Sequence, residues 1–336
     1  MISQYLKHLC AAVALSAMQL MALDGMVLYT TSKPFGSGDL SLKYLSSGKV
    51  ITLEKGGVFG PSFSPDGKSV AYSKNSREIC TILINGENKK KVTGCGGKEV
   101  SVNWVGADKL YWSQCDKNIY AVKIDGSGKK TVFKYGKNIH NAGVSQDGKR
   151  AAWTSPSWEL GLGDLSTGKG WAKGGGCQGS ISPNGKYYTH NQHNHTDCKI
   201  GKFDGGTLKT IHPPSGKFNA HRWSHKSNDY VLYTIEGSHA GYVHNIQTNK
   251  AAATGTKGFI WDYFPEEVNV GSDPVAIDEM RELTVHWQHN VNTVRNNLSY
   301  TVDGRRLAGQ TSPAHFLIIV TAGNGHKNKR AILTLK

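Results

Sequence analysis

The sequence predicts an all-β fold, a six-bladed β-propeller of four-stranded blades followed by a small C-terminal β-sandwich-like domain. Two observations predict the propeller: a short phrase that returns about every forty residues, and short strand-like stretches between its copies. The copies are Ser64-Pro-Asp-Gly-Lys-Ser69, Val105-Gly-Ala-Asp-Lys-Leu110, Ser145-Gln-Asp-Gly-Lys-Arg150, Ser182-Pro-Asn-Gly-Lys-Tyr187 and Ser224-His-Lys-Ser-Asn-Asp229.

Each repeat carries the same succession of elements. A short apolar stretch precedes the phrase, and its Asp-Gly or Asn-Gly pair supplies the positive φ angles of a tight hairpin turn. An alternating strand such as Ser69-Val-Ala-Tyr72 follows the turn. Two further strands complete the unit, as in Asn118–Ile124 and Lys130–Lys134, which Asp125-Gly-Ser-Gly128 separates. These patterns predict four strands in each blade.

A sixth blade is predicted where the two ends of the ring meet. Met26–Thr30, Asp39–Tyr44 and Lys49–Leu53 supply three of its strands. The fourth is expected from the other end of the repeat region, in Phe259–Glu266. The propeller is therefore expected over residues 24–270, closed by a strand near 259–268, and this closure removes an exposed sheet edge.

The two ends of the chain are expected to lie outside the propeller. Residues 1–23 carry Lys7 and His8 and then a mostly apolar run, which predicts a secretory signal peptide. The mature chain is therefore expected to be secreted or at the cell surface, without a transmembrane anchor. Residues 271–290 are expected to be a linker, and residues 291–336 a C-terminal domain for sorting or attachment.

The phrase Ser64-Pro-Asp-Gly-Lys68, with Phe63 before it, resembles the TolB-like propeller repeat, a relative of WD-repeat blades. That family includes binding scaffolds, peptidase gating domains and polysaccharide lyases, so the resemblance implies the fold more than an activity. The second copy departs from the pattern, with Val105-Gly-Ala-Asp108.

The C-terminal segments Asn297–Leu307, Ala314–Thr321 and Lys329–Lys336 resemble the sorting domain of type IX secretion substrates. This resemblance implies an export machinery as a partner. The alternative is an ordinary small β-sandwich appendage.

The formal net charge is +15. Within residues 24–270 the only arginines are Arg77, Arg150 and Arg222, so the positive charge there is nearly all lysine. One interpretation is attraction to a polyanion such as an extracellular acidic polysaccharide, and the other is solvated turns on a basic protein. A nucleic-acid partner is not expected, because an Arg-rich segment or recognition helix is missing. Many of the lysines flank turns: Lys68, Lys129, Lys130, Lys149 and Lys186.

Five cysteines follow the predicted signal peptide, which is an odd number. In an exported protein some of them are expected to pair, although the sequence leaves the pairing open. Buried free thiols are the alternative. The five are Cys80, Cys95, Cys115, Cys177 and Cys198.

The expected site is one mouth of the central channel. In a propeller the first strand of each blade begins, and the second ends, at the same face, so their loops gather there on a rigid scaffold. We expect ligand contacts from residues that precede or begin first strands and from the loops after second strands. These candidates are Glu99, His140, Asn219, His221, Arg222, Trp261 and Asp262, together with Trp158, His190, His193, His195 and His239.

Two functions fit these candidates. The first is a binding module for an extracellular glycan, cell-wall material or protein, and the positive charge favours an anionic one. The second is a polysaccharide lyase in which His140 or His221 removes a proton next to a uronic carboxylate and Arg222 neutralises that carboxylate. Enzyme activity is left undecided. The alternatives to a site are an exposed polar loop for the histidine cluster, and structural hydrogen bonding in the channel for His140 and His221.

The cofactor is unknown from the sequence, with a divalent metal as one option. Neutral imidazoles bind transition metals, so His190, His193 and His195 are the candidate ligands. The nucleophile elbow, the phosphate loop and the dinucleotide fingerprint are all missing from the sequence.

Overall fold

The computed structural model describes residues 23–31, 38–268, 316–320 and 329–333, and every regular element in these ranges is a strand. The chain divides into two compact units, Met1–Val270 and Gly271–Lys336. In the second unit, β24 (Phe316–Val320) pairs antiparallel with β25 (Lys329–Leu333). The predicted signal peptide, the linker and most of the predicted sorting domain lie outside the described residues.

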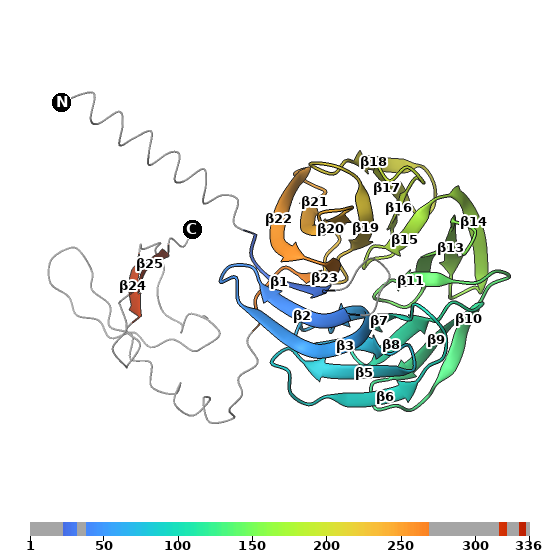
Figure 1. Cartoon of the computed structure of the whole chain (residues 1–336), viewed down its shortest axis with the longest axis horizontal. Coiled ribbons are helices and arrows are strands. Elements are labelled where there is room, and N and C mark those ends of the chain that lie inside the picture. The colour runs from blue at the N-terminus through green and yellow to red at the C-terminus, as the bar shows by residue number, and fades with distance from the viewer. Residues whose placement is uncertain (1–22, 32–37, 269–315, 321–328, 334–336) are drawn as a thin grey trace, which may run out of the picture. The chain divides into compact units, whose positions relative to one another are not determined.

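The described part of the first unit contains five antiparallel sheets, which Figure 1 shows arranged in a ring. The largest has seven strands in the order β23-β1-β2-β3-β4-β5-β6. Its strands are β1 (Met26–Thr30), β2 (Gly38–Tyr44), β3 (Val50–Phe63), β4 (Ser69–Lys74), β5 (Glu78–Leu83), β6 (Lys90–Gly94) and β23 (Phe259–Phe264).

Four sheets of four strands follow in sequence order. They are β7 (Ser101–Val105), β8 (Lys109–Ser113), β9 (Asn118–Lys123) and β10 (Lys130–Lys134); β11 (His140–Val144), β12 (Arg150–Thr154), β13 (Glu159–Asp164) and β14 (Lys169–Gly175); β15 (Cys177–Ile181), β16 (Tyr187–Asn191), β17 (Cys198–Lys202) and β18 (Thr207–Ile211); and β19 (Phe218–Trp223), β20 (Tyr230–Ile235), β21 (Ala240–Asn245) and β22 (Lys250–Lys257). The all-β prediction is confirmed, and the sheets match those of propeller folds.

The long strand β3 belongs to two sets of strands. Its first part pairs with β2, from Val50 opposite Lys43, and its second part pairs with β4, ending with Phe63 opposite Val70. Dividing the seven-stranded sheet at β3 gives two four-stranded sets, so the count of six blades depends on this division and stays a prediction.

The first strands of successive sets form a closed ring of contacts. β3, β7, β11, β15, β19 and β23 each contact the next, and β23 contacts β3. β23 also pairs antiparallel with β1, with Met26 opposite Phe264 and Thr30 opposite Phe259. A C-terminal strand thus lies beside the N-terminal ones, at the place where the sequence analysis expected the ring to close.

The repeated phrase builds a turn through its own side chains. The Ser64 hydroxyl donates a hydrogen bond to the Asp66 carboxylate (2.6 Å) and accepts one from the backbone N–H of Ser69 (2.9 Å). The same pair of bonds recurs in the turns that begin at Ser145 and Ser182. The serine and the carboxyl or amide residue are therefore constrained by the turn itself.

The glycine of the first phrase has a second role. Gly67 adopts φ = 72°, which a side chain disfavours, and a Cβ atom there would lie 2.8 Å from Cζ of Phe264. Phe264 belongs to β23 and is 1% exposed, so moving its ring aside would disrupt the packing of the core and cost free energy. The turn of one set of strands therefore packs directly on the closing strand.

The described cysteines Cys80, Cys95, Cys115, Cys177 and Cys198 are all free. The expectation that some of them pair is therefore wrong in this structure, and the alternative of free thiols holds. Cys80, Cys177 and Cys198 are buried, and the other two are partly buried. In the described part of the chain, the structure has no helix with the length and apolar character needed to cross a membrane.

Replacing Gly67 with alanine tests the packing of the closing strand. Gly67→Ala adds both backbone strain and a collision with Phe264, so we expect it to lower the free energy of unfolding by about 2–4 kcal/mol. Gly48→Ala is the matched control, because Gly48 has φ = 71° and an open surrounding. It should lose only the strain, about 1–2 kcal/mol. Equal losses in urea unfolding would contradict the proposed contact.

Candidate functional site

The order of the strands gives the ring two ends. We call the loop end the one where first strands begin and second strands finish, with Glu99 and Cys115 among its residues. We call the turn end the opposite one, which carries the repeated phrases. The sequence analysis placed every candidate site residue at or near the loop end.

Backbone strain is concentrated at the loop end. Non-glycine residues rarely adopt a positive φ, each at a cost of about 1–3 kcal/mol, and such residues cluster at functional sites. Several of those in this chain lie in loop-end segments: Glu99 (φ 51°), Cys115 (59°), Asn141 (47°), Trp158 (57°), Gln178 (58°), His195 (60°) and His239 (54°).

Glu99, Cys115 and His140 come together at this end. Nδ1 of His140 lies 3.2 Å from Oε2 of Glu99, and Sγ of Cys115 lies 3.9 Å from the same oxygen. Among the described residues, these three form the group of possible metal donors whose ligand atoms all lie within 4.8 Å of one another. Burial, and then the charge of Glu99, raises the pKa of the Cys115 thiol to about 12.

The histidines expected to bind metal gather around a different cysteine. Sγ of Cys177 lies 3.5 Å from Nε2 of His195 and 3.9 Å from Nδ1 of His193. His190 lies apart from this contact, packed at 5.8 Å from the ring of Tyr188. Its Nδ1 is buried without a hydrogen-bond partner, and burial lowers its pKa. The compact donor group is therefore not the predicted trio of histidines.

His221 and Arg222 line the central channel. His221 is 2% exposed, and neither ring nitrogen has a hydrogen-bond partner. Burial, followed by the nearby charges of His190, His195 and Arg222, lowers the pKa of His221 to about 3, so its imidazole is neutral at pH 7. In the described part of the chain, no contact joins it to His140, the other histidine predicted as a general base.

The channel is filled by side chains. The guanidinium of Arg222 stacks over Trp261 (4.7 Å) and donates to the Ser101 hydroxyl (3.0 Å). It borders two cavities of about 20 Å³ each. A cavity of this size accommodates about one water molecule. A sugar unit of a polysaccharide therefore does not fit against Arg222.

Asp262, predicted to bind ligand, makes hydrogen bonds that connect the closing strand to other strands and turns of the ring. Its carboxylate accepts hydrogen bonds from the backbone N–H groups of Phe63 (2.9 Å), His225 (2.9 Å) and Tyr263 (2.8 Å). Burial raises its pKa, and the neighbouring His225 acts in the opposite direction. The residue is 2% exposed, and its hydrogen bonds connect three separate segments.

Three candidates remain: Trp158, Asn219 and His239. Trp158 is 52% exposed, and Asn219 is 8% exposed, with its carbonyl accepting a hydrogen bond from the Gln178 side chain. The backbone N–H of His239 donates to Ile235 (3.0 Å). The Gln178 side chain also accepts a hydrogen bond from the backbone N–H of His221 (2.9 Å), and the carbonyl of Trp158 accepts one from Gly176 (2.9 Å).

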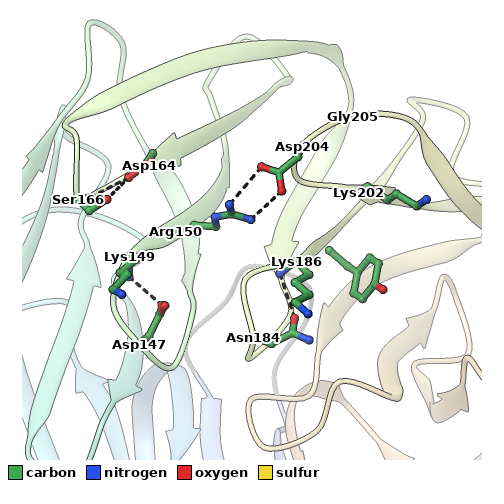
Figure 2. Close-up of a pocket in the computed structure, with 11 residues that line it drawn as sticks. Asp147, Lys149, Arg150, Asp164, Ser166, Asn184, Lys186, Lys202, Asp204 and Gly205 are labelled. Atoms are coloured by element: carbon green, nitrogen blue, oxygen red, sulfur yellow. Dashed lines mark hydrogen bonds and ion pairs between the residues drawn. The ribbon is translucent and has the colours of Figure 1, made fainter.

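A large cavity lies at the turn end, opposite the predicted mouth. It measures about 690 Å³, which is within the usual size range of ligand sites, and it lies between the β11–β14 and β15–β18 sheets (Figure 2). Its lining residues are Asp147, Lys149, Arg150, Asp164, Ser166, Asn184, Lys186, Tyr187, Lys202, Asp204 and Gly205. We call this cavity the lysine pocket.

The acidic groups of the lysine pocket already have partners. Asp147 and Asp164 accept hydrogen bonds within their own turns, and the Ser166 hydroxyl lowers the pKa of Asp164. Asp204 pairs with Arg150 across the two sheets (3.1 Å), as Figure 2 shows. Arg150 also stacks on the ring of Phe203 at 4.4 Å.

The lysines of this pocket are exposed. In the described part of the chain, the ammonium groups of Lys149, Lys186 and Lys202 have no hydrogen bond or ion pair. The sequence analysis noted Lys149 and Lys186 as lysines beside turns but did not place them in the site. The sequence could have indicated this pocket, because Lys149 and Lys186 occupy the same position in two adjacent repeats. Equivalent positions of adjacent repeats lie side by side in a propeller.

No protein-family model matches the chain, and no curated protein matches it. Among solved structures the chain is similar to TolB from Acinetobacter baumannii, with a TM-score of 0.56 and 15% sequence identity. That match covers 75% of this chain and 70% of TolB. A chain in the crystal structure of a nidogen/laminin complex is similar with a TM-score of 0.54 and 10% identity, covering 72% of this chain and 99% of that one. At these identities the similarity shows the fold, a β-propeller like that of TolB.

Asp262→Ala tests the structural role of this carboxylate. The change leaves buried N–H groups of Phe63 and His225 without an acceptor, at a cost of about 1–3 kcal/mol for each group. We expect a clearly lower midpoint of urea unfolding. The control is Asp108→Ala, an exposed turn residue, which should change the free energy of unfolding by less than about 0.5 kcal/mol. An Asp262→Ala protein as stable as the control would contradict the assignment.

Proposed function

We propose that this chain is an exported propeller that binds an anionic extracellular ligand in the lysine pocket, with an acidic glycan as the first candidate. The observation that carries the proposal is that the lysine side chains around this cavity are unpaired while its carboxylates already have partners. Lys149, Lys186 and Lys202 are exposed and unpaired, whereas the carboxylates beside them are held by their turns or by Arg150.

The shape and charge of the pocket suit a polymer better than a small apolar molecule. Its lining residues are almost all charged or polar, and Tyr187 is the main ring among them. Cationic side chains around an open cavity attract polyanions, and the range of this attraction shortens as the salt concentration rises. The net charge of +15 adds to the attraction. Tyr187 offers one aromatic face beside the lysines.

Location and partners are part of the same proposal. The apolar N-terminal segment supports export, and the C-terminal resemblance supports passage through a dedicated secretion machinery with attachment at the cell surface. An extracellular glycan or an anionic protein would then be within reach. The similar chain from the nidogen/laminin complex supports a scaffold role, because that propeller takes part in a protein assembly.

The alternative of a polysaccharide lyase is less well supported. A general base must come within hydrogen-bonding reach of the proton that it removes. His221 is 2% exposed, and the guanidinium of Arg222 faces a filled channel. His140 is accessible, but it contacts Glu99 and Cys115 rather than a cationic side chain that would neutralise a uronic carboxylate.

The combined replacement Lys149→Ala, Lys186→Ala and Lys202→Ala tests the proposed site. Each exposed charge contributes about 0.2–1 kcal/mol, so we expect the affinity for polygalacturonate to fall roughly 3- to 150-fold. Affinity of the full chain should also weaken as salt increases, and neutral dextran should bind poorly. Isothermal titration or immobilised-ligand binding would measure these differences.

The matched control replaces three exposed loop-end lysines, Lys173, Lys217 and Lys257, with alanine. This triple variant carries the same net charge as the first one. If both triple variants lose the same affinity, binding depends on total charge and the pocket assignment fails. If the wild-type chain binds no acidic glycan, the ligand class is wrong. If unsaturated uronides form and absorb in the ultraviolet, the chain is a lyase.

A further inference from the structure

Three metal-donor side chains meet at the loop end from segments far apart in sequence. Glu99 lies just before β7, Cys115 follows β8, and His140 is the first residue of β11. They therefore bring together the β7–β10 and β11–β14 sheets. We infer that Glu99, Cys115 and His140 form a transition-metal site, with Zn²⁺ as its first candidate.

The distances between the donors suit a tetrahedral ion. With Zn–N and Zn–O bonds of about 2.0–2.1 Å and Zn–S bonds of about 2.3 Å, two ligand atoms lie about 3.2–3.7 Å apart. The His140–Glu99 separation is 3.2 Å, and the Cys115–Glu99 separation is 3.9 Å. All three donor atoms lie within 4.8 Å of one another, so small side-chain rotations complete the geometry.

The backbone provides an independent observation. Glu99 and Cys115 have φ angles of 51° and 59°, and Asn141, directly after His140, has 47°. Each donor thus lies at or beside a residue in the left-handed region, where a side chain costs about 1–3 kcal/mol. Glycine would relieve this cost at each position, but glycine at 99 or 115 would remove a donor.

The chemistry of the donors narrows the choice of ion. A thiolate and an imidazole favour Zn²⁺ or Cu⁺ over Mg²⁺ and Ca²⁺, which prefer oxygen ligands. The three donors leave a fourth position of a tetrahedral site for water or a ligand. The side chains of His140 and Glu99 are 25% and 32% exposed, so an ion and a ligand can enter from solvent.

Asp116, which directly follows Cys115, is not expected to be the fourth metal ligand. Asp116 accepts hydrogen bonds from the Tyr120 hydroxyl (2.6 Å), the Asn118 backbone (2.8 Å) and the Gln114 side chain (3.0 Å). These bonds hold Asp116 within the loop after β8. The fourth ligand therefore comes from solvent or from a bound molecule.

Cobalt binding tests this inference. The full chain, freed of metal with a chelator, is titrated with Co²⁺, whose tetrahedral thiolate complexes show a near-ultraviolet charge-transfer band and strong visible bands. We expect about one Co²⁺ per chain, displaced by Zn²⁺. Cys115→Ser should abolish the charge-transfer band. His140→Gln and Glu99→Gln should keep the band but weaken binding roughly 10-fold or more.

The control is Cys177→Ser, because Cys177 is the other described thiol in contact with histidines. Its band should match that of the wild type. If Cys177→Ser loses the band and Cys115→Ser keeps it, the metal binds at Cys177 and the inference is wrong. If the wild type shows no band, or only weak octahedral bands, the inference is also wrong. Thermal unfolding without metal identifies variants that fail to fold. The test then rests on His140→Gln, because the His140 side chain is 25% exposed and its replacement disturbs the core little.

The metal site and the lysine pocket lie at opposite ends of the ring, so each can be tested alone. The triple lysine variant should bind Co²⁺ like the wild type. Loss of cobalt binding in that variant would contradict the separation of the two sites.

Discussion

The pairing of β23 with β1 is the constraint on which the rest of the structure depends. Two hydrogen bonds accompany it, from Trp261 Nε1 to the Thr30 hydroxyl (2.9 Å) and from the Tyr263 hydroxyl to the carbonyl of Asp24 (2.8 Å). Asp262, between these two aromatic residues, accepts bonds from three backbone N–H groups. Strands more than two hundred residues apart are thus joined, and no sheet edge is left at the seam.

Closure of the ring constrains the geometry of the candidate sites at its two ends. Loop-end residues such as Glu99 and Cys115 adopt strained backbone angles, and such angles persist only where the surrounding structure enforces them. Glu99 precedes β7, which belongs to the closed ring of first strands, and Cys115 follows β8, which pairs with β7. At the turn end, the Arg150–Asp204 pair crosses between two sheets and fixes the wall of the lysine pocket. Both candidate sites therefore depend on the relative positions of neighbouring sheets.

The sequence predicted the features that arise within one repeat. The turn that begins at Ser64 depends on a hydroxyl and a carboxylate two residues apart, so its spacing is visible in the chain. The fold class followed from the repetition of this turn. Cys115, Glu99 and His140 come from two neighbouring repeats. Their spacing in the sequence is not regular, so it does not predict that they lie close together. His221 and Asp262 were expected to contact a ligand. The structure buries both, and Arg222 stacks on Trp261 beside them in the channel. This packing joins residues of different repeats, so it could not be predicted from the sequence.

The filled channel also explains why the two ends are expected to act independently. The cavities that Arg222 borders hold about 20 Å³ each, so they accommodate about one water molecule each and no ligand passes through them. Coupling between the ends would have to travel through the strands themselves and would require a second arrangement of the sheets. The closure at β23 opposes such a change, because any rotation of one sheet would strain the bonds to Asp262. An anion at the lysine pocket and an ion at Cys115 would then bind without affecting each other's affinity.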